Sequence, residues 1–263
     1  MTRWPLLFVL FFGVAVGTAP AWAQPAGAVQ AYYEAYAAGV NVVQMEAAFT
    51  VDPDRYAIRL DYRTVGAFGL LLSSRQNTVV EGRFVGTRPA PERFYSSGVL
   101  RGAPRVTQID YRDGQPVVRQ LQPPTETERE QVASADQANT VDTLSAMAAL
   151  IRQVNTSGRC EGRLATFDGR RLSVLEARSG GEQALERTGR SSFAGLALRC
   201  DFVGRQLGGF MLDEDRERLQ RPHTGTAWLA SVTAGGPKIP VRIAFRTRWF
   251  GEATMYLADK PAP

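Results

Sequence analysis

RYAIRLDYR, residues 55–63, decides the fold, because its apolar and charged side chains alternate without a break. One face carries Tyr56, Ile58, Leu60 and Tyr62, and the other carries Arg55, Arg59, Asp61 and Arg63. A period of two is typical of a β-strand with one face on a core and the other in water. The run therefore predicts a half-buried strand of an antiparallel sheet.

Further short runs with strand character lie on both sides of this one, separated by turn residues. They occupy residues 29–37, 44–51, 78–85, 93–100, 105–111 and 115–121, and then 160–167, 171–177, 183–187, 195–204, 228–233, 239–247 and 253–258. A spacing of roughly 10 to 12 residues per strand is typical of a meander, sandwich or barrel. We therefore expect an all-β chain, a curved antiparallel sheet of about a dozen strands, either open or partly closed as a barrel or β-spiral.

Two segments interrupt the strands in the middle of the chain. Residues 122–140 contain Pro123-Pro124 and are rich in Thr, Glu, Gln and Ala, which predicts a flexible acidic linker. Residues 142–154 predict one short helix, with Asp142 as its N-cap and apolar side chains at helical spacing. Residues 65–72, VGAFGLLL, are either a buried connection or short helical turn, or a mobile apolar flap beside a cavity.

The first 23 residues have the pattern of a secretory signal peptide. A positive start and an apolar run at 5–17 precede Ala21-Trp22-Ala23, which places the predicted cleavage after Ala23. An apolar run of about 13 residues is shorter than the roughly 20 that a membrane-spanning helix needs. The remaining residues, 24–263, are expected to form a single periplasmic β domain with no integral membrane segment.

The chain has two cysteines, Cys160 and Cys200. In an oxidising compartment an even number of cysteines indicates a disulfide more often than a metal site or a nucleophile. Leu196, Leu198 and Phe202 share a strand face with Cys200, which turns that thiol inward. We therefore predict a disulfide between Cys160 and Cys200.

No catalytic, metal-binding or cofactor-binding pattern stands out, and none of these roles is assigned to any residue. His223 is the only histidine, and no nucleophile elbow accompanies it. Asp213, Glu214 and Asp215 are the carboxylates nearest to a metal-binding pattern, but their spacing fits neither a calcium-binding loop nor a zinc site. Carboxylates on separate strands could still form a glycosidase pair, and the candidates are Glu34, Glu46, Glu81 and Glu176.

The net charge of +5 comes from arginines that are scattered along the strands, since only Lys238 and Lys260 are lysines. Nucleic-acid sites need clustered basic residues with interleaved aromatics, so we expect no nucleic-acid partner. Weak attraction to anionic lipid or to polyanionic envelope material is compatible with this charge.

Four motifs follow one another along the chain: YEAYAAG at 33–39, PERF at 91–94, DTLSAM at 142–147, and GRCEGR at 158–163 leading to FDGRR at 167–171. In this order they resemble the exported bacterial domain-of-unknown-function family 3108. The resemblance implies an exported, mostly antiparallel β protein of unassigned activity, and it supplies no catalytic residues. By fold analogy the chain is similar to periplasmic proteins of the lipoprotein-carrier type, whose concave sheet receives an apolar chain or a partner.

These observations favour a non-enzymatic periplasmic envelope protein that binds an apolar ligand, such as a lipid or acyl chain, or a protein partner on the concave face of its sheet. One alternative is a purely structural protein needed for envelope integrity. The other is a glycan hydrolase that uses dispersed carboxylates. Finding a ligand separates the first hypothesis from the second, and a carboxylate pair in a cleft would identify the third.

Overall fold

The computed structural model describes residues 27–247 and 251–261. The predicted signal peptide and the cleavage after Ala23 lie outside these residues. The described chain forms one antiparallel sheet of 13 strands. The strands are β1 (Val29–Ala37), β2 (Val40–Val51), β3 (Arg55–Thr64), β4 (Ser74–Val85), β5 (Arg88–Leu100), β6 (Ala103–Arg112), β7 (Gln115–Gln122), β8 (Gly162–Phe167), β9 (Leu172–Leu185), β10 (Gly195–Gly208), β11 (His223–Ser231), β12 (Lys238–Arg246) and β13 (Glu252–Leu257).

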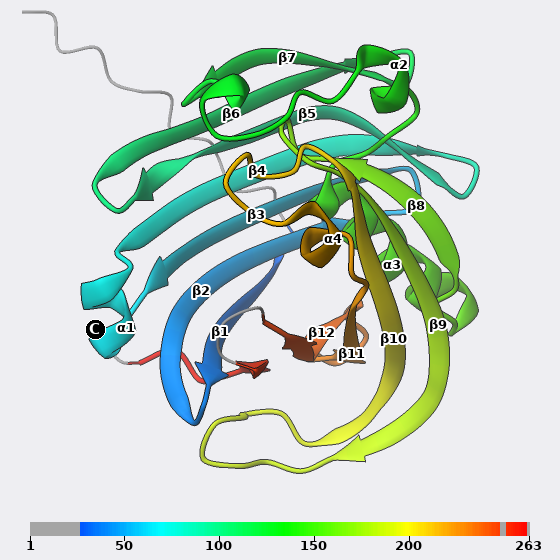
Figure 1. The fold of residues 1–263 in the computed structure, drawn as a ribbon. Helices are drawn as coiled ribbons and strands as arrows, with labels where there is room; N and C mark the ends of the chain where they lie inside the picture. The colour runs from blue at the N-terminus through cyan, green and yellow to red at the C-terminus, as the bar shows by residue number, and fades with distance from the viewer. Residues whose placement is uncertain (1–26, 248–250, 262–263) are drawn as a thin grey trace, which may run out of the picture.

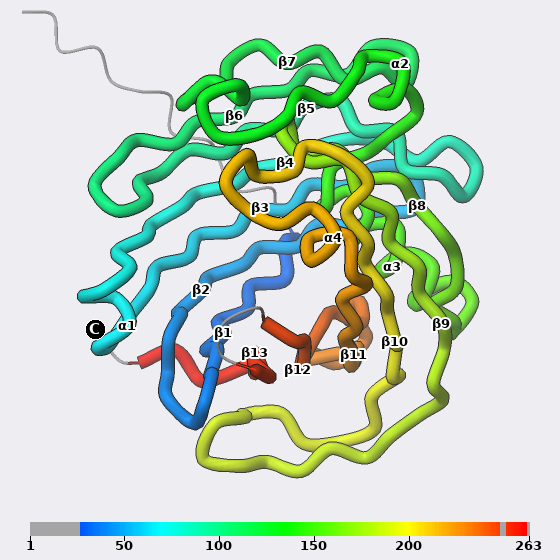
Figure 2. Tube along the Cα trace, in the orientation of Figure 1, coloured from blue at the N-terminus to red at the C-terminus, as the bar shows by residue number. Residues whose placement is uncertain are grey.

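The first and last strands of the described chain, β1 and β13, pair at the centre of the sheet. Its order is β7-β6-β5-β4-β3-β2-β1-β13-β12-β11-β10-β9-β8, so every strand pairs with a sequence neighbour except where β1 meets β13. Tyr33 pairs with Leu257 in that contact, and Figure 2 shows the two segments side by side. The edges β7 and β8 therefore come from the middle of the chain, on either side of the interruption in the strand pattern.

The sheet coils into a nearly closed barrel with one seam, between β7 and β8 (Figure 1). The turn after β8 reaches across this seam, since a side chain on Gly169 would lie 2.7 Å from the methyl group of Thr107 in β6. The all-β fold class and the partly closed antiparallel sheet are confirmed. Alternation works as expected in β3, where Tyr56 and Ile58 are buried and face the interior.

The predicted helix is α3 (Thr143–Ser157), which extends three residues beyond the predicted end. Asp142 is its N-cap, and Gly158 ends it in the left-handed conformation with φ of 66°. Asn155 bonds to the backbone of Lys238, and Arg152 donates to the carbonyl of Gly86. The helix thus lies across one end of the barrel and fills it with apolar side chains.

Residues 122–140 are not a free linker, which corrects the sequence-based expectation. They contain a 3-10 turn, η1 (Thr125–Thr127), and a short helix, α2 (Ser134–Gln137), and Thr125 is buried. Main-chain hydrogen bonds join the end of the segment to both sides of the seam: Asn139 N–H donates to the carbonyl of Gly114, and Val141, directly after the segment, pairs with the β8 edge. The composition is acidic, but the segment is anchored because it satisfies edge groups that would otherwise be exposed.

Two more short helices lie in connections within the described residues, α1 (Gly66–Leu71) and α4 (Arg216–Leu219). Of the alternatives for residues 65–72, the helical turn is present, but no α1 residue is buried. Nowhere in the described chain does a helix have the length and apolar character needed to cross a bilayer.

Candidate functional site

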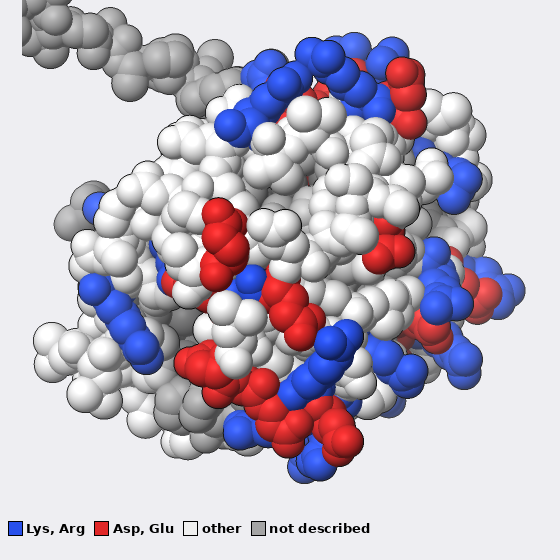
Figure 3. Space-filling view, turned by 45° about the horizontal axis from the view of Figure 1, so that its top comes forward, with Lys and Arg blue, Asp and Glu red and all other residues white. Residues whose placement is uncertain are grey.

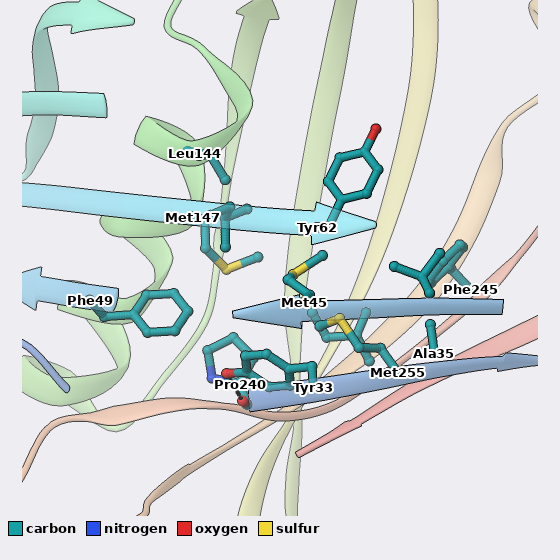
Figure 4. Close-up of a pocket in the computed structure, with 13 residues that line it drawn as sticks. Tyr33, Ala35, Met45, Phe49, Tyr62, Leu144, Met147, Pro240, Phe245 and Met255 are labelled. Carbon is teal, nitrogen blue, oxygen red and sulfur yellow. Dashed lines mark hydrogen bonds between the residues drawn. The ribbon is translucent and has the colours of Figure 1, made fainter. Parts of the chain in front are cut away.

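An apolar cavity of about 380 Å³ lies inside the barrel, between the first turns of α3 and five neighbouring strands. Figure 4 shows Leu144 and Met147 of α3 at one end of it and Tyr62 and Phe245 at the other. The residues that line it are Tyr33, Ala35, Val43, Met45, Phe49, Leu60, Tyr62, Leu144, Met147, Pro240, Ile243, Phe245 and Met255.

The strand register explains why a cavity forms here. Val43, Ala35, Met255 and Ile243 are successive cross-strand partners over β2, β1, β13 and β12, so they form one row on the inner face. Directly paired side chains on one face normally touch and fill the space above the sheet. Ala35 stands in the middle of this row with a single methyl group, so space remains open above it.

The cavity presents almost no polar group. The hydroxyl of Tyr33 donates to the carbonyl oxygen of Pro240 at 2.7 Å, so it is satisfied within the wall. Its side chain is 1% exposed, and burial raises the pKa of Tyr33 far above its usual range. Tyr62, at the other end, is half-buried. Such a lining suits a hydrocarbon.

Three methionines line the cavity, Met45, Met147 and Met255. Methionine is unbranched and has a polarizable thioether, so it adapts its shape to apolar ligands of different outline. Phe245 is 38% exposed, so the cavity reaches solvent at its end. The cavity is therefore lined by adaptable side chains and open to solvent at one end.

The four candidate carboxylates lie away from this cavity, on the outer face of the sheet. Glu46 pairs with Lys260, Glu81 with Arg93, and Glu176 with Arg163. Glu34 accepts hydrogen bonds from Tyr36 and other neighbours. The structure therefore does not bring these carboxylates together in the cavity.

The histidine and the acidic run considered in the sequence analysis also lie outside the cavity. His223 begins β11, and Asp215 is the N-cap of α4, where it accepts from Glu217 N–H. Within the described chain, no three His, Cys, Asp or Glu side chains are grouped so as to hold a metal ion. On the face drawn in Figure 3, acidic and basic side chains are interspersed over the centre and the lower half, and a band of mostly basic side chains lies along the upper edge.

Cys160 and Cys200 lie at disulfide distance, with their Cα atoms 5.9 Å apart and both side chains fully buried. Cys160 follows the end of α3, and Cys200 lies in β10 opposite Ser179 of β9. The pair therefore ties the end of the helix to the sheet across β9. Neither cysteine lines the cavity.

A buried polar cluster lies beside the cavity, and the sequence pointed only to its N-cap. Asp142 is 0% exposed and accepts hydrogen bonds from the backbone N–H and the hydroxyl of Ser145, at 2.8 and 2.5 Å. Ser145 in turn accepts from the Tyr56 hydroxyl at 2.8 Å. Burial raises the pKa of Asp142 to about 6, and the hydrogen bonds from Ser145 oppose this shift. The cluster positions the start of α3, which forms one end of the cavity.

Comparisons with known proteins agree with this fold. No curated protein matches the chain. Among solved structures, the chain is similar to a beta-barrel-like protein of the domain of unknown function DUF1849 from Brucella abortus, with 14% identity and a TM-score of 0.53. The match covers 88% of this chain and 95% of that one, and at this identity it shows the fold alone. The sequence profile of a family described as protein of unknown function, DUF3108, matches residues 30–258. Since the match spans nearly all of the described chain, the protein belongs to the DUF3108 family.

Proposed function

We propose that this protein is a non-enzymatic periplasmic binding protein of the cell envelope, which holds the hydrocarbon chain of a lipid inside its barrel. The observation that carries this proposal is the apolar cavity of about 380 Å³ between α3 and the inner face of β1, β2, β3, β12 and β13. The signal-like pattern of residues 1–23 and the disulfide-distance pair of cysteines support an exported location.

The size and chemistry of the cavity favour a hydrocarbon. Small-molecule sites have volumes of about 300 to 1,000 Å³, and an apolar cavity of about 150 Å³ already stays dry and binds benzene. A larger apolar cavity that reaches solvent gains free energy when an alkyl chain replaces its water, at about 0.8 kcal/mol for each buried CH₂ group. A polar head group would stay at the Phe245 end, where the cavity is open.

The first test extracts the purified protein with organic solvent and identifies the extracted molecules by mass spectrometry. A lipid or fatty acid in stoichiometric amount is expected. A delipidated sample should then bind a dansyl-labelled fatty acid, with enhanced fluorescence from the apolar environment. A clean extract together with no probe binding would contradict the proposal and favour the purely structural alternative.

The second test fills the cavity with Ala35→Phe. The new ring would occupy the space above the row of inner side chains, so affinity for the dansyl fatty acid should fall at least about tenfold. Thermal stability should stay near the wild-type value, because the ring enters empty space instead of a packed core. The matched control is Ala57→Phe, whose position on β3 lies between the inward-facing Tyr56 and Ile58 and so faces outward. Equal binding by both variants would show that the cavity is not the site.

A further inference from the structure

Three connections of the barrel lie at the end where the cavity is open. Antiparallel strands alternate in direction, so the β1–β2, β3–β4 and β5–β6 turns share one end of the sheet. Hydrogen bonds link them in a row: Val65 N–H donates to Val42 at 3.0 Å, and Arg101 N–H donates to Ser73 at 2.7 Å. Val43, a cavity residue, lies directly beside this row.

The β3–β4 connection contains α1 and presents two leucines to solvent. Leu70 is 89% exposed and Leu71 is 84% exposed, which makes them the most exposed large apolar side chains of the described residues. A single exposed leucine is ordinary, whereas two adjacent leucines at the tip of a connection form a continuous exposed apolar surface. Figure 1 shows α1 at the left margin, with α3 on the other side of the barrel.

The base of this connection is fixed, so the exposure of its tip is a built feature. The hydroxyl of Thr64 donates to the carbonyl of Leu72 at 2.8 Å and accepts from Ser74 N–H at 2.9 Å. Gly69 packs closely against the same threonine, since a Cβ there would lie 3.0 Å from the Thr64 carbonyl oxygen. The chain is thereby closed into a compact turn that holds its two leucines outward.

The turns themselves carry basic and no acidic residues, whereas Glu34, Glu46 and Asp61 lie further along the same strands, and Glu46 and Asp61 share a surface hollow with Arg63 and Arg75. Residues 35–45, 62–76 and 95–104 contain no Asp or Glu, and they contain Arg63, Arg75 and Arg101, all exposed. Arg63 and Arg75 are direct cross-strand partners on β3 and β4. Like charges in this position repel each other, and an anion bound between them relieves the repulsion.

We propose that this end of the barrel docks on an anionic phospholipid bilayer, with Leu70 and Leu71 inserted at the boundary of head groups and acyl chains. Arg63, Arg75 and Arg101 would contact lipid phosphates. Exposed leucines beside basic residues are the combination that binds proteins to a membrane interface. The open end of the cavity would then face the bilayer, so that a lipid chain could pass between them. This transfer role rests on the proposed function, whereas the docking itself does not.

The decisive experiment places one fluorophore at the tip. Cys160 and Cys200 lie at disulfide distance, so Leu70→Cys would introduce the reactive thiol for labelling with NBD. Val85→Cys is the matched control: Val85 is 69% exposed, at the far end of β4 from α1. The length of β4 places positions 70 and 85 roughly 35 Å apart.

With vesicles of phosphatidylglycerol and phosphatidylethanolamine, NBD at position 70 should shift to the blue and brighten, and NBD at position 85 should not. Vesicles of phosphatidylcholine alone should give a much smaller change. No change at position 70, or equal changes at both positions, would overturn the docking surface.

Vesicle flotation of unlabelled variants gives a second measurement. Leu70→Ser with Leu71→Ser should lower the partition coefficient at least about tenfold, because two apolar side chains no longer enter the interface. Arg75→Gln with Arg101→Gln should lower it about tenfold at low salt and less at high salt. Wild-type partition by both double variants would contradict the proposal. Because these assays do not depend on a ligand, vesicle binding with a clean extract and no binding of the dansyl fatty acid would refute only the cavity function, and the reverse result would refute only the docking.

Discussion

Asp142 shows at the scale of one residue how the barrel holds its helix. Its carboxyl group caps α3 and is fully buried, within a cluster that also contains Ser145 and Tyr56. Burial disfavours the charged form, so the pKa of Asp142 rises to about 6 even though hydrogen bonds favour the carboxylate. The start of α3 is therefore sensitive to the protonation of one group.

The stability contributed by Asp142 should decrease as the pH rises. Because its folded pKa exceeds the unfolded value of 3.8, the contribution is complete below that value and is lost as the pH rises through about 6. A rise of this size corresponds to about 3 kcal/mol in the free energy of unfolding. Asp142→Asn keeps an N-cap of equal quality and removes the titration. Urea unfolding between about pH 4 and pH 7 should show the difference between the two proteins changing by this amount, and parallel curves would contradict the assignment.

At the scale of secondary-structure elements, the position of α3 is determined by its contacts with the sheet. The helix covers one end of the barrel and supplies Leu144 and Met147 to the cavity. Its C-terminal end is joined to the sheet through Asn155 and through the pairing of Cys160 with Cys200 in β10. The backbone N–H of Cys160 also donates to the hydroxyl of Ser179 on β9. The C-terminal end of α3 is thus attached to three strands: β12 through Asn155, β10 through the disulfide, and β9 through the hydrogen bond from Cys160 to Ser179.

Replacement of both cysteines by serine should lower the stability of the domain without closing the cavity. The cysteines are 40 residues apart, and a loop of that length predicts a loss of about 4 kcal/mol. For a domain of this size the melting temperature should fall by roughly 10 °C in a calorimetric scan. Binding of the dansyl fatty acid, measured well below the transition, should remain, since neither cysteine lines the cavity. An unchanged melting temperature would refute the pairing.

On the scale of the whole molecule, side-chain contacts bridge the seam between β7 and β8. Glu128 lies in the segment that fills it and accepts two hydrogen bonds from Arg105, at 2.7 and 2.5 Å. From the same segment, Arg129 donates to the carbonyl of Gly209. Across the seam, Arg170 donates to the carbonyl of Pro123. These contacts connect residues 122–140 to β6 on one side of the seam and, on the other side, to the turns that follow β8 and β10. Together they form a continuous wall across the seam.

Glu128→Gln should loosen this wall. The pair with Arg105 is about a quarter exposed, so removing its charge should cost about 2 kcal/mol near neutral pH, between the values for surface and buried pairs. The hydrogen bonds from Arg105 lower the pKa of Glu128, so its stabilising effect is present above the unfolded value of 4.5 and is lost in acid. Urea unfolding should give this loss near pH 7 and a smaller one near pH 3.

Hydrogen exchange locates the effect of Glu128→Gln on the same molecule. Faster exchange is expected in β7, β8 and residues 122–140, with β2 and β3 unchanged. The matched control is Glu81→Gln, which breaks a more exposed pair with Arg93 between β4 and β5. Uniform acceleration across all strands, or the same result for both variants, would show that the seam is not a separate unit.

The local pattern of side chains was enough to predict most strands and the helix. The run RYAIRLDYR forms β3, and α3 begins after Asp142 and ends before Gly158. Both follow from the local sequence, because alternation and capping depend on neighbouring residues. Gly180-Gly181 was less informative. It lies between the separate strands predicted at 171–177 and 183–187, yet β9 runs through it, because β10 supplies pairing partners on both sides and the glycines lie at a register shift.

The sequence by itself determined the all-β class, the single long helix and the pairing of the two cysteines, since each follows from residue type and local spacing. Only the tertiary structure decided that residues 122–140 close a seam, that Ala35 leaves a cavity, and that Leu70 and Leu71 stand at its open end. The physical reason is the distance along the chain. Ala35 meets Met255, and Glu128 meets Arg105, only after the sheet has coiled, and the free energy of such contacts depends on a geometry that no local pattern contains.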